Sequence, residues 1–170
     1  MVILALGSNL SSSFGDRFHN INLAISFLEA YKIKLLKKSS FFETPSYPDK
    51  KNPKFINVII EVLTQLPPED LMSVLIFVEE KLERNRKKKN DPRTCDIDLI
   101  DYNGQIVDFK YKNLDFTIPH KELASRSFVL FPLQEILPEW RHPKTNESVS
   151  NLIKKLPDDE KNSILKIKKS

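Results

Sequence analysis

The sequence predicts an α+β fold, and two patterns predict it. Short apolar segments typical of strands are interspersed with two longer segments whose apolar residues recur every three or four positions, as on one face of a helix. Their order is strand, helix, strand, strand, helix, strand, the βαββαβ order of a ferredoxin-like sandwich with helices on one face of an antiparallel sheet. With 170 residues, 40% of them hydrophobic, the chain can build one core, and we expect a single domain over 1–170.

The pattern opens with a buried strand and a helix. Residues 2–6 are apolar and end at the turn signal Gly7-Ser8-Asn9. A helix of about five turns is expected next. Its apolar stripe is formed by Phe14, Phe18, Ile21, Ile25 and Leu28.

Two strands and a second helix follow. The segment Lys32 to Phe42 is expected to form one strand, residues 44–53 form a proline-broken loop, and Phe55 to Leu63 form the third strand. Two prolines and two acidic residues over 67–70 are typical of a helix N-terminus. The stripe of this helix consists of Leu71, Leu75, Val78 and Leu82.

The second half begins with a basic segment. Lys81 to Arg93 carries seven basic and two acidic residues, so we expect a mobile solvated loop. The strand Cys95 to Tyr102 then completes the sandwich. The last third adds a C-terminal strand and helix segment, with Phe109 to Ile118, a helix near Ser125 to Leu130, and a lysine-rich tail. From about 154 we expect a final helix or a frayed solvated end rather than a binding arm.

Composition narrows the partner and the compartment. A net charge of +4 and a pI near 9.0 favour an anionic partner without separating nucleotides from nucleic acid. The single cysteine excludes an intramolecular disulfide and fits a reducing compartment. The apolar start over 1–6 is far shorter than the roughly 18 residues that span a bilayer, and no basic region precedes it. We therefore expect a cytoplasmic protein that does not enter a membrane.

Two carboxylates and an arginine stand at the start of the fourth predicted strand. Asp96 and Asp98 are two residues apart, so both project to one face of an extended segment while their neighbours face the core. Magnesium prefers one or two carboxylates together with phosphate oxygens and water, and two ions could share a polyphosphate here. Alternatively, Asp96 and Asp98 are surface residues paired with Arg93 or with lysines. The three glycines of the chain fit no phosphate-binding loop, so side chains and metal must hold any phosphate.

A second strand places polar groups on the same face. Phe55 and Asn57 share the parity that points away from the predicted helices, as Asp96 and Asp98 do. An aromatic ring, an amide and two carboxylates on an exposed sheet face suit a polar heteroaromatic ligand. Ordinary alternation of polar and apolar residues is the alternative for either strand alone. His120 by itself is more often a structural histidine.

Six sequence blocks resemble one family, the 6-hydroxymethyl-7,8-dihydropterin pyrophosphokinases. The resemblance runs from Leu4 to about Glu139, and its most specific block is Pro92 to Leu99. The other blocks are Ala5 to Leu10, Phe41 to Pro45, Phe55 to Asn57, Ile118 to His120 and Arg126 to Leu133.

The resemblance implies a transferase of folate biosynthesis that moves pyrophosphate from ATP to the hydroxymethyl group of the reduced pterin and releases AMP. It implies two Mg²⁺ ions on Asp96 and Asp98. Arg84 and Arg93 would stabilise transition-state charge. The ATP contacts would be Glu79, Arg84, Arg86, Arg93, Leu99, Thr117, His120 and Arg126. The pterin contacts would be Thr44, Pro45, Phe55, Asn57, Asp96 and Phe128, with the pterin ring between the two phenylalanines.

The chain also departs from the family pattern. Lys89-Asn90-Asp91 stands where Arg-Trp-Gly is common, in a loop one residue shorter, so an aromatic that could cover the pterin is missing. Asp115 stands where a basic contact to ATP often occurs, and Lys121 where an aromatic or polar residue is common.

Two other classes of function are alternatives to an enzyme. A nucleic-acid-binding module of the same fold should carry the basic-Gly-aromatic pattern on its third strand, and residues 52–58 lack it, so we expect no nucleic-acid partner. The other alternative, a small metal-binding regulatory domain, does not explain Phe55, Asn57 and Phe128. No large apolar stripe is left over, so we expect a monomer.

Overall fold

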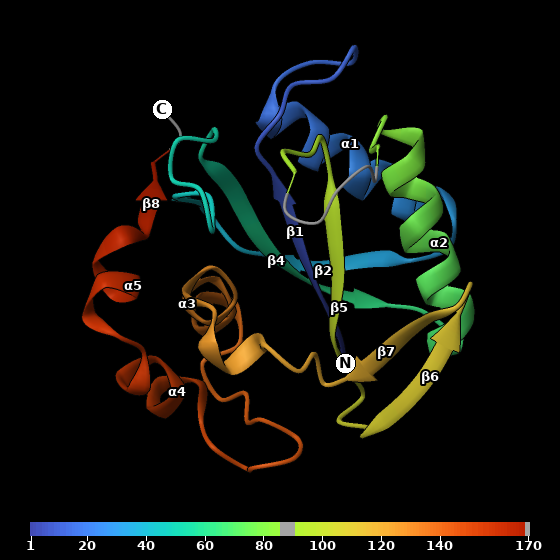
Figure 1. Cartoon of the computed structure of the whole chain (residues 1–170). Coiled ribbons are helices and arrows are strands. Elements are labelled where there is room, and N and C mark those ends of the chain that lie inside the picture. Colours follow the sequence, from blue (N-terminus) through green and yellow to red (C-terminus); the bar gives the residue numbers. More distant parts are fainter. Residues whose placement is uncertain (86–90, 169–170) are drawn as a thin grey trace.

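The computed structural model describes residues 1–85 and 91–168. An antiparallel sheet has the order β5-β1-β4-β3-β8, with β2 also paired to β4, and a separate hairpin joins β6 to β7 (Figure 1). The strands are β1 (Val2–Ser8), β2 (Lys34–Lys38), β3 (Phe41–Thr44), β4 (Phe55–Leu63), β5 (Asp96–Tyr102), β6 (Val107–Tyr111), β7 (Leu114–Ile118) and β8 (Leu165–Ile167). The helices are α1 (Arg17–Ala30), α2 (Pro68–Lys81), the 3-10 turn η1 (Leu123–Ser125), α3 (Ser127–Ile136), α4 (Val149–Lys155) and α5 (Asp158–Ser163).

The ferredoxin-like α+β fold is confirmed, with one change in the second strand. Lys32 to Phe42 forms two strands, β2 and β3, which both pair with β4. The break falls at Ser39, whose N–H donates to the Ile59 carbonyl (2.9 Å) and whose hydroxyl accepts from the Ile59 N–H (3.0 Å). A side chain that replaces a ladder hydrogen bond competes with the strand pairing, so the strand divides there.

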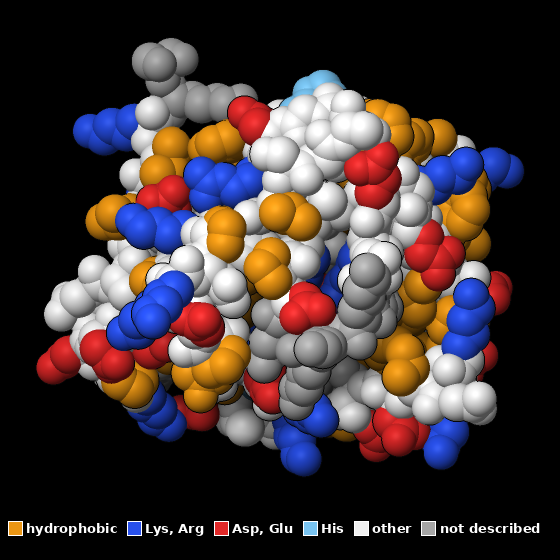
Figure 2. Space-filling view, turned by 45° about the horizontal axis from the view of Figure 1, so that its top comes forward, with side chains coloured by type: hydrophobic (Ala, Val, Ile, Leu, Met, Phe, Trp, Pro, Cys, Tyr) orange, Lys and Arg blue, Asp and Glu red, His pale blue; other side chains and the backbone are white. Residues whose placement is uncertain are grey.

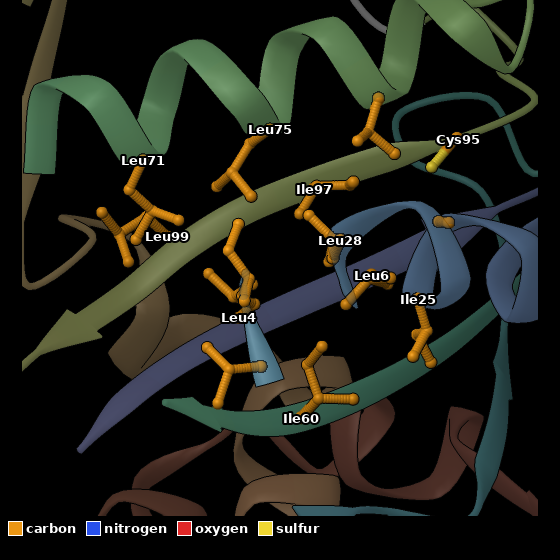
Figure 3. Close-up of a cluster of buried hydrophobic side chains, with 14 of the residues drawn as sticks. Leu4, Leu6, Ile25, Leu28, Ile60, Leu71, Leu75, Cys95, Ile97 and Leu99 are labelled. Atoms are coloured by element: carbon orange, nitrogen blue, oxygen red, sulfur yellow. The ribbon is translucent and has the colours of Figure 1, made fainter. Parts of the chain in front are cut away.

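The first core lies between the sheet and helices α1 and α2. Figure 3 shows Leu71 and Leu75 of α2 directed toward Leu99 of β5. The predicted core parity of the third and fourth strands is confirmed because all of its members are buried in this cluster: Ile56, Val58, Ile60, Val62, Cys95, Ile97 and Leu99.

A second core covers most of the opposite face, which was expected to be open. Ile3 and Ala5 of β1 and Ile59 of β4 pack with α3, α4 and the buried Trp140. These strands are apolar on both parities, as in sheets buried on both sides. Figure 1 shows α1 and α2 on one side of the sheet and α3 to α5 on the other. Part of this face stays uncovered by the second core at the end of the sheet that carries Asp96 and Asn57.

The last third differs most from expectation. Residues 109–118 form most of the β6–β7 hairpin, whose turn places Lys112 and Asn113 at positive φ. The tail contains a final helix, α5, which is one of the two expected forms, and it continues into the unexpected strand β8, which pairs with β3. Ile167 of β8 packs against the first core. Within the described segments, no helix has both the length and the apolar content that crossing a membrane requires.

The sole cysteine, Cys95, should be unreactive in the folded chain. It is fully buried, and burial, followed by the charges of Glu79 and Asp96, raises the pKa of its thiol well above the ordinary value. The reactive thiolate is then scarce at neutral pH. We expect no labelling by DTNB in native buffer and one thiol per chain in guanidinium. Rapid labelling of the native protein would contradict the burial of Cys95.

Candidate active site

Asp96, at the start of β5, binds two arginines. Arg84 Nη1 donates to Asp96 Oδ1 (2.6 Å), and Arg93 Nη1 donates to Asp96 Oδ2 (3.0 Å). The side chain of Asp96 is 26% exposed, while that of Arg84 is only 9% exposed. Charge-assisted pairs of this kind hold both partners in fixed orientations, so one aspartate fixes two guanidinium groups at the open end of the sheet.

A buried glutamate holds Arg84 in place. Glu79 accepts hydrogen bonds from the Ile97 N–H (2.7 Å) and from the Arg84 guanidinium. Burial disfavours the charged guanidinium of Arg84, but Asp96, Glu79 and Asp98 together raise its pKa above the ordinary value. Glu79 therefore joins α2 to β5 and keeps Arg84 charged.

The expected solvated loop over Lys81 to Arg93 is wrong for its first residues. Lys81 ends α2, Leu82 is fully buried, and the Arg84 side chain is buried between acidic groups. A basic residue does not stay solvated where two carboxylates compensate its burial. Arg86, Lys89 and Asn90 lie outside the described residues, so the predicted role of Arg86 and most of the altered Lys89-Asn90-Asp91 sequence stay predictions.

Asp98 carries the second carboxylate. Arg126 Nη1 donates to Asp98 Oδ2 (3.1 Å), and His120 Nε2 lies 4.0 Å from the same oxygen. Burial, and then the charge of Asp96, raise the pKa of Asp98 above its ordinary value, although His120, Arg126 and Arg84 oppose the shift. The two carboxylates thus repel each other and draw cations toward this end of the sheet.

His120 is oriented by the chain that follows it. The Glu122 N–H donates to His120 Nδ1 (3.2 Å), so that nitrogen accepts and the ring proton of the neutral form lies on Nε2. Burial lowers the pKa of His120 despite the attraction of Asp98. A neutral ring with its N–H directed toward the carboxylate end is the result.

Asn9 fixes Arg93 and was not singled out as a site residue from the sequence. Its Oδ1 accepts from the Arg93 N–H (2.7 Å), while its Nδ2 donates to Ser46 Oγ (3.1 Å) and to the Pro53 carbonyl (3.0 Å). The side chain is almost fully buried. Asn9 therefore ties the segment of Arg93 to the 44–53 loop. The one sequence feature that could have indicated a role for Asn9 is its position in the family-like block Ala5 to Leu10.

Three adjacent strands form the floor of the site. Gly7 of β1 is paired with Asn57 of β4 on one side and with Asp96 of β5 on the other. A Cβ at Gly7 would lie 3.3 Å from Asn57 Oδ1 and 3.5 Å from the Phe55 ring. Glycine thus leaves space on the floor between the amide and the carboxylate. Sequence reasoning assigned no role to Gly7 beyond the turn.

The predicted aromatic and amide residues lie beside this floor. The Arg93 guanidinium stands 5.7 Å from the centroid of Phe55, and that of Arg126 stands 5.4 Å from the centroid of Phe128. Asn57 Nδ2 donates to Thr44 Oγ1 (3.0 Å). Each aromatic ring is therefore next to an arginine that also binds one of the aspartates. Pro45 follows Thr44 and is half-buried.

Among the described residues, two predicted nucleotide contacts, Thr117 and Leu99, make no side-chain hydrogen bond with the arginines and carboxylates described above. Thr117 is exposed on β7, donates to Asp108 (2.7 Å) and lines a cavity of about 330 Å³ on the hairpin. The side chain of Leu99 lies in the first core, so only its backbone is available to a ligand. The departure at Asp115 is an exposed residue that pairs with Lys110 (3.3 Å).

The donor set suits a hard cation that brings further ligands. In the described part of the chain, no cluster of three or more His, Cys, Asp and Glu side chains is arranged around a metal position. Asp96 and Asp98 supply carboxylate oxygens on one face of β5. Mg²⁺ needs no more protein ligands than this when phosphate oxygens and water complete its shell. The residues therefore fit Mg²⁺ bound with a polyphosphate.

The fold and the site together define an α+β domain in which arginines and two carboxylates adjoin aromatic rings at one end of the sheet. The chain belongs to the 7,8-dihydro-6-hydroxymethylpterin-pyrophosphokinase (HPPK) family, whose model matches residues 3–138. This membership confirms the resemblance found in the sequence.

Individual relatives agree with the family match. The chain is 32% identical to a 2-amino-4-hydroxy-6-hydroxymethyldihydropteridine pyrophosphokinase of Synechocystis, over 91% of this chain and 75% of the relative. It is 34% identical to the folic acid synthesis protein FOL1 of Dictyostelium discoideum, over 93% of this chain and 23% of that protein. The chain spans about a fifth of the length of FOL1 and of two fungal relatives of the same kind.

A solved structure shares the fold. A crystal structure of Plasmodium falciparum HPPK-DHPS with pteroate superposes with a TM-score of 0.75 over 98% of this chain and 46% of that chain. The two sequences are 15% identical, so the likeness establishes the fold alone.

Removing Glu79 should destabilise the fold more than any exposed change on α2. Glu79→Ala leaves the Ile97 N–H without its acceptor and removes one carboxylate from the buried Arg84, so we expect a loss of about 3 kcal/mol in the free energy of unfolding. Urea denaturation measures it. The matched control is Glu80→Ala, an exposed neighbour expected to change stability by less than about 0.5 kcal/mol. Equal stability of the two variants would contradict the anchoring role of Glu79.

Proposed function

We propose that the chain transfers a pyrophosphoryl group from ATP to 6-hydroxymethyl-7,8-dihydropterin and releases AMP. The observation that carries the proposal is the row Asn57, Gly7 and Asp96 across three adjacent strands. It sets an amide suited to a pterin edge beside a carboxylate suited to a metal-bound polyphosphate. Family membership supports the same reaction, since the Synechocystis relative is named as this pyrophosphokinase.

In the proposed complex Asp96 and Asp98 hold two Mg²⁺ ions. Bound there, Mg²⁺ would neutralise the triphosphate and polarise the β-phosphoryl group. Arg93 and Arg126, which now bind these aspartates, would be released toward the phosphates as the metal replaces them. Arginine is suited to this exchange because its planar fork matches phosphate as well as carboxylate.

The nucleotide is assigned to the cationic side of the site. Arg84, held by Glu79 and Asp96, and Arg93, whose Nε donates to the Asp91 carbonyl (3.1 Å), would stabilise the charge that develops on the transferred group, since preorganised cations act mainly in the transition state. His120 would donate from Nε2 to a phosphate oxygen. The remaining ATP contacts inferred from the family are Glu79, Arg86, Leu99 through its backbone, Thr117 and Arg126.

The pterin is assigned to the aromatic side. Phe55 and Phe128 would stack on its two faces, and Asn57, held by Thr44, would read its amide edge together with the backbone near Pro45. Asp96 would meet the hydroxymethyl group, which is the nucleophile. This arrangement brings the attacking oxygen and the β-phosphorus to one place without a covalent enzyme intermediate.

We propose small-molecule substrates and no nucleic-acid partner, since residues 52–58 lack the basic-Gly-aromatic pattern. Among the described residues on the face shown in Figure 2, Lys and Arg side chains are interspersed with Asp and Glu side chains. We further propose one domain, a monomer, and a cytoplasmic location.

The decisive experiment is AMP formation from Mg·ATP with and without the pterin. The proposal predicts AMP only when both substrates are present, in a one-to-one ratio with the pyrophosphorylated pterin. AMP or ADP release that does not respond to the pterin would indicate an ATPase. Pterin binding without AMP formation would indicate a binding module.

Asp98→Asn should separate activity from stability. The variant should lose AMP formation by more than about a hundredfold, because a metal ligand is gone. The pKa of Asp98 is raised in the folded state, so its contribution to stability is present at acidic pH and is lost as pH rises through that pKa. In metal-free buffer at pH 7 the melting temperature of the variant should therefore equal or exceed that of the unmodified chain. Any excess in melting temperature should be smaller at pH 4. A melting temperature several degrees lower at pH 7 would contradict this account of Asp98.

A further inference from the structure

The C-terminal segment 158–167 lies beyond residues 3–138, which the family model matches, yet it touches both sides of the candidate site. It consists of α5 and β8. Figure 1 shows both beside α3 and at the edge of the sheet. Its contacts reach α3, which carries Phe128, and β3, which ends at Thr44.

The first contact fixes the start of α3. Ser127 Oγ donates to Glu160 Oε2 (3.0 Å), and Ser127 is only 1% exposed. Ser127 stands between Arg126, which binds Asp98, and Phe128. A hydrogen bond to a buried hydroxyl here constrains the turn from which the Phe128 side chain projects.

The second contact lies on the sheet. In the β8–β3 pairing Lys166 is opposite Phe42, and in the β3–β4 pairing Phe42 is opposite Asn57. Asn57 Nδ2 also donates to the Phe42 carbonyl (3.4 Å). The strand beside the pterin-reading amide is therefore paired on its outer edge by the tail.

A third contact joins α3 both to the residue before β3 and to β8. Glu135, in the last turn of α3, accepts from the Ser40 N–H (3.1 Å) and hydroxyl (2.7 Å) through Oε1. Its Oε2 lies 3.5 Å from Lys166 Nζ of β8. Helix α3, strand β3 and the tail thus form one connected unit, with Phe128 at one end of it and Thr44 at another.

We propose that residues 158–167 act as a strap that sets the position of Phe128 relative to Asn57 and thereby determines affinity for the pterin. Glu160 is its principal positioning residue. The inference rests on the proposed function, because it names what that site needs from the tail. A flat ring held between two aromatic faces tolerates little change in their position, whereas ATP would be held mainly by metal and by Arg84 and Arg93, which lie outside α3, β3 and the tail.

The test compares Glu160→Ala with Asp159→Ala, an exposed neighbour on the same helix. Pterin affinity is measured in the full chain from pterin fluorescence in the presence of Mg²⁺ and a non-hydrolysable ATP analogue, with kcat and both KM values in parallel. We expect Glu160→Ala to weaken pterin binding about three- to tenfold, the scale of one lost hydrogen bond, with kcat and the KM for ATP nearly unchanged. Asp159→Ala should behave as the unmodified chain.

Two further variants identify the hydrogen bond as the cause. Glu160→Gln keeps an acceptor oxygen for Ser127 and should restore the affinity. Ser127→Ala should reproduce the loss, and the double variant with Glu160→Ala should lose no more than either alone.

Three outcomes would count against the inference. Unchanged pterin affinity in Glu160→Ala would overturn it while leaving the proposed function intact. Equal losses for ATP and pterin together with a lowered melting temperature would overturn it in favour of a merely structural role. Failure of the unmodified chain to bind the pterin would overturn the proposed function, and the inference with it.

Discussion

The site depends on the neutralisation of three carboxylates at one end of β5. Glu79, Asp96 and Asp98 would repel one another and resist burial if they stood alone. Arg84 binds two of them, and Arg93 and Arg126 add further compensation. Because a carboxylate deprived of its partner is costly, this charge balance holds α2, the segment of Arg93 and the start of α3 against the same strand end. The groups that would bind metal and triphosphate are therefore already gathered.

The sheet determines where such a cluster can be open to a ligand. Both of its faces are buried along most of their length, by α1 and α2 on one side and by α3 and α4 on the other. The strand ends around Gly7 keep Asn57 and Asp96 on a part of the α3 and α4 side that the second core does not cover. Gly7 contributes the lack of a side chain, so Asn57 and Asp96 can stand on either side of an unobstructed floor. An amide suited to a heteroaromatic ring and a carboxylate suited to metal-bound phosphate therefore lie next to each other.

The sequence predicted what depends on local periodicity. The period-two pattern placed Ile56 and Ile97 in the core and Asp96 and Asp98 on the other face, and the structure has them there. It did not predict features set by contacts between distant segments. The strand break follows from Ser39 bonding to Ile59, and β8 forms because β3 offers an edge. Ile59 and Ile3, apolar on the supposedly open parity, were a local sign of the second core. The roles of individual site residues came from the family and stay predictions.

The central claim is that a metal held by Asp96 and Asp98 adjoins the hydroxymethyl group of a pterin bound between Phe55 and Phe128. Paramagnetic relaxation of the bound pterin tests it directly, with Mn²⁺ replacing Mg²⁺ and a non-hydrolysable ATP analogue present. We expect strong relaxation of the hydroxymethyl protons, and loss of this relaxation in Asp96→Asn with the pterin still bound. A bound pterin whose hydroxymethyl protons are not relaxed by Mn²⁺ in the unmodified chain would contradict it.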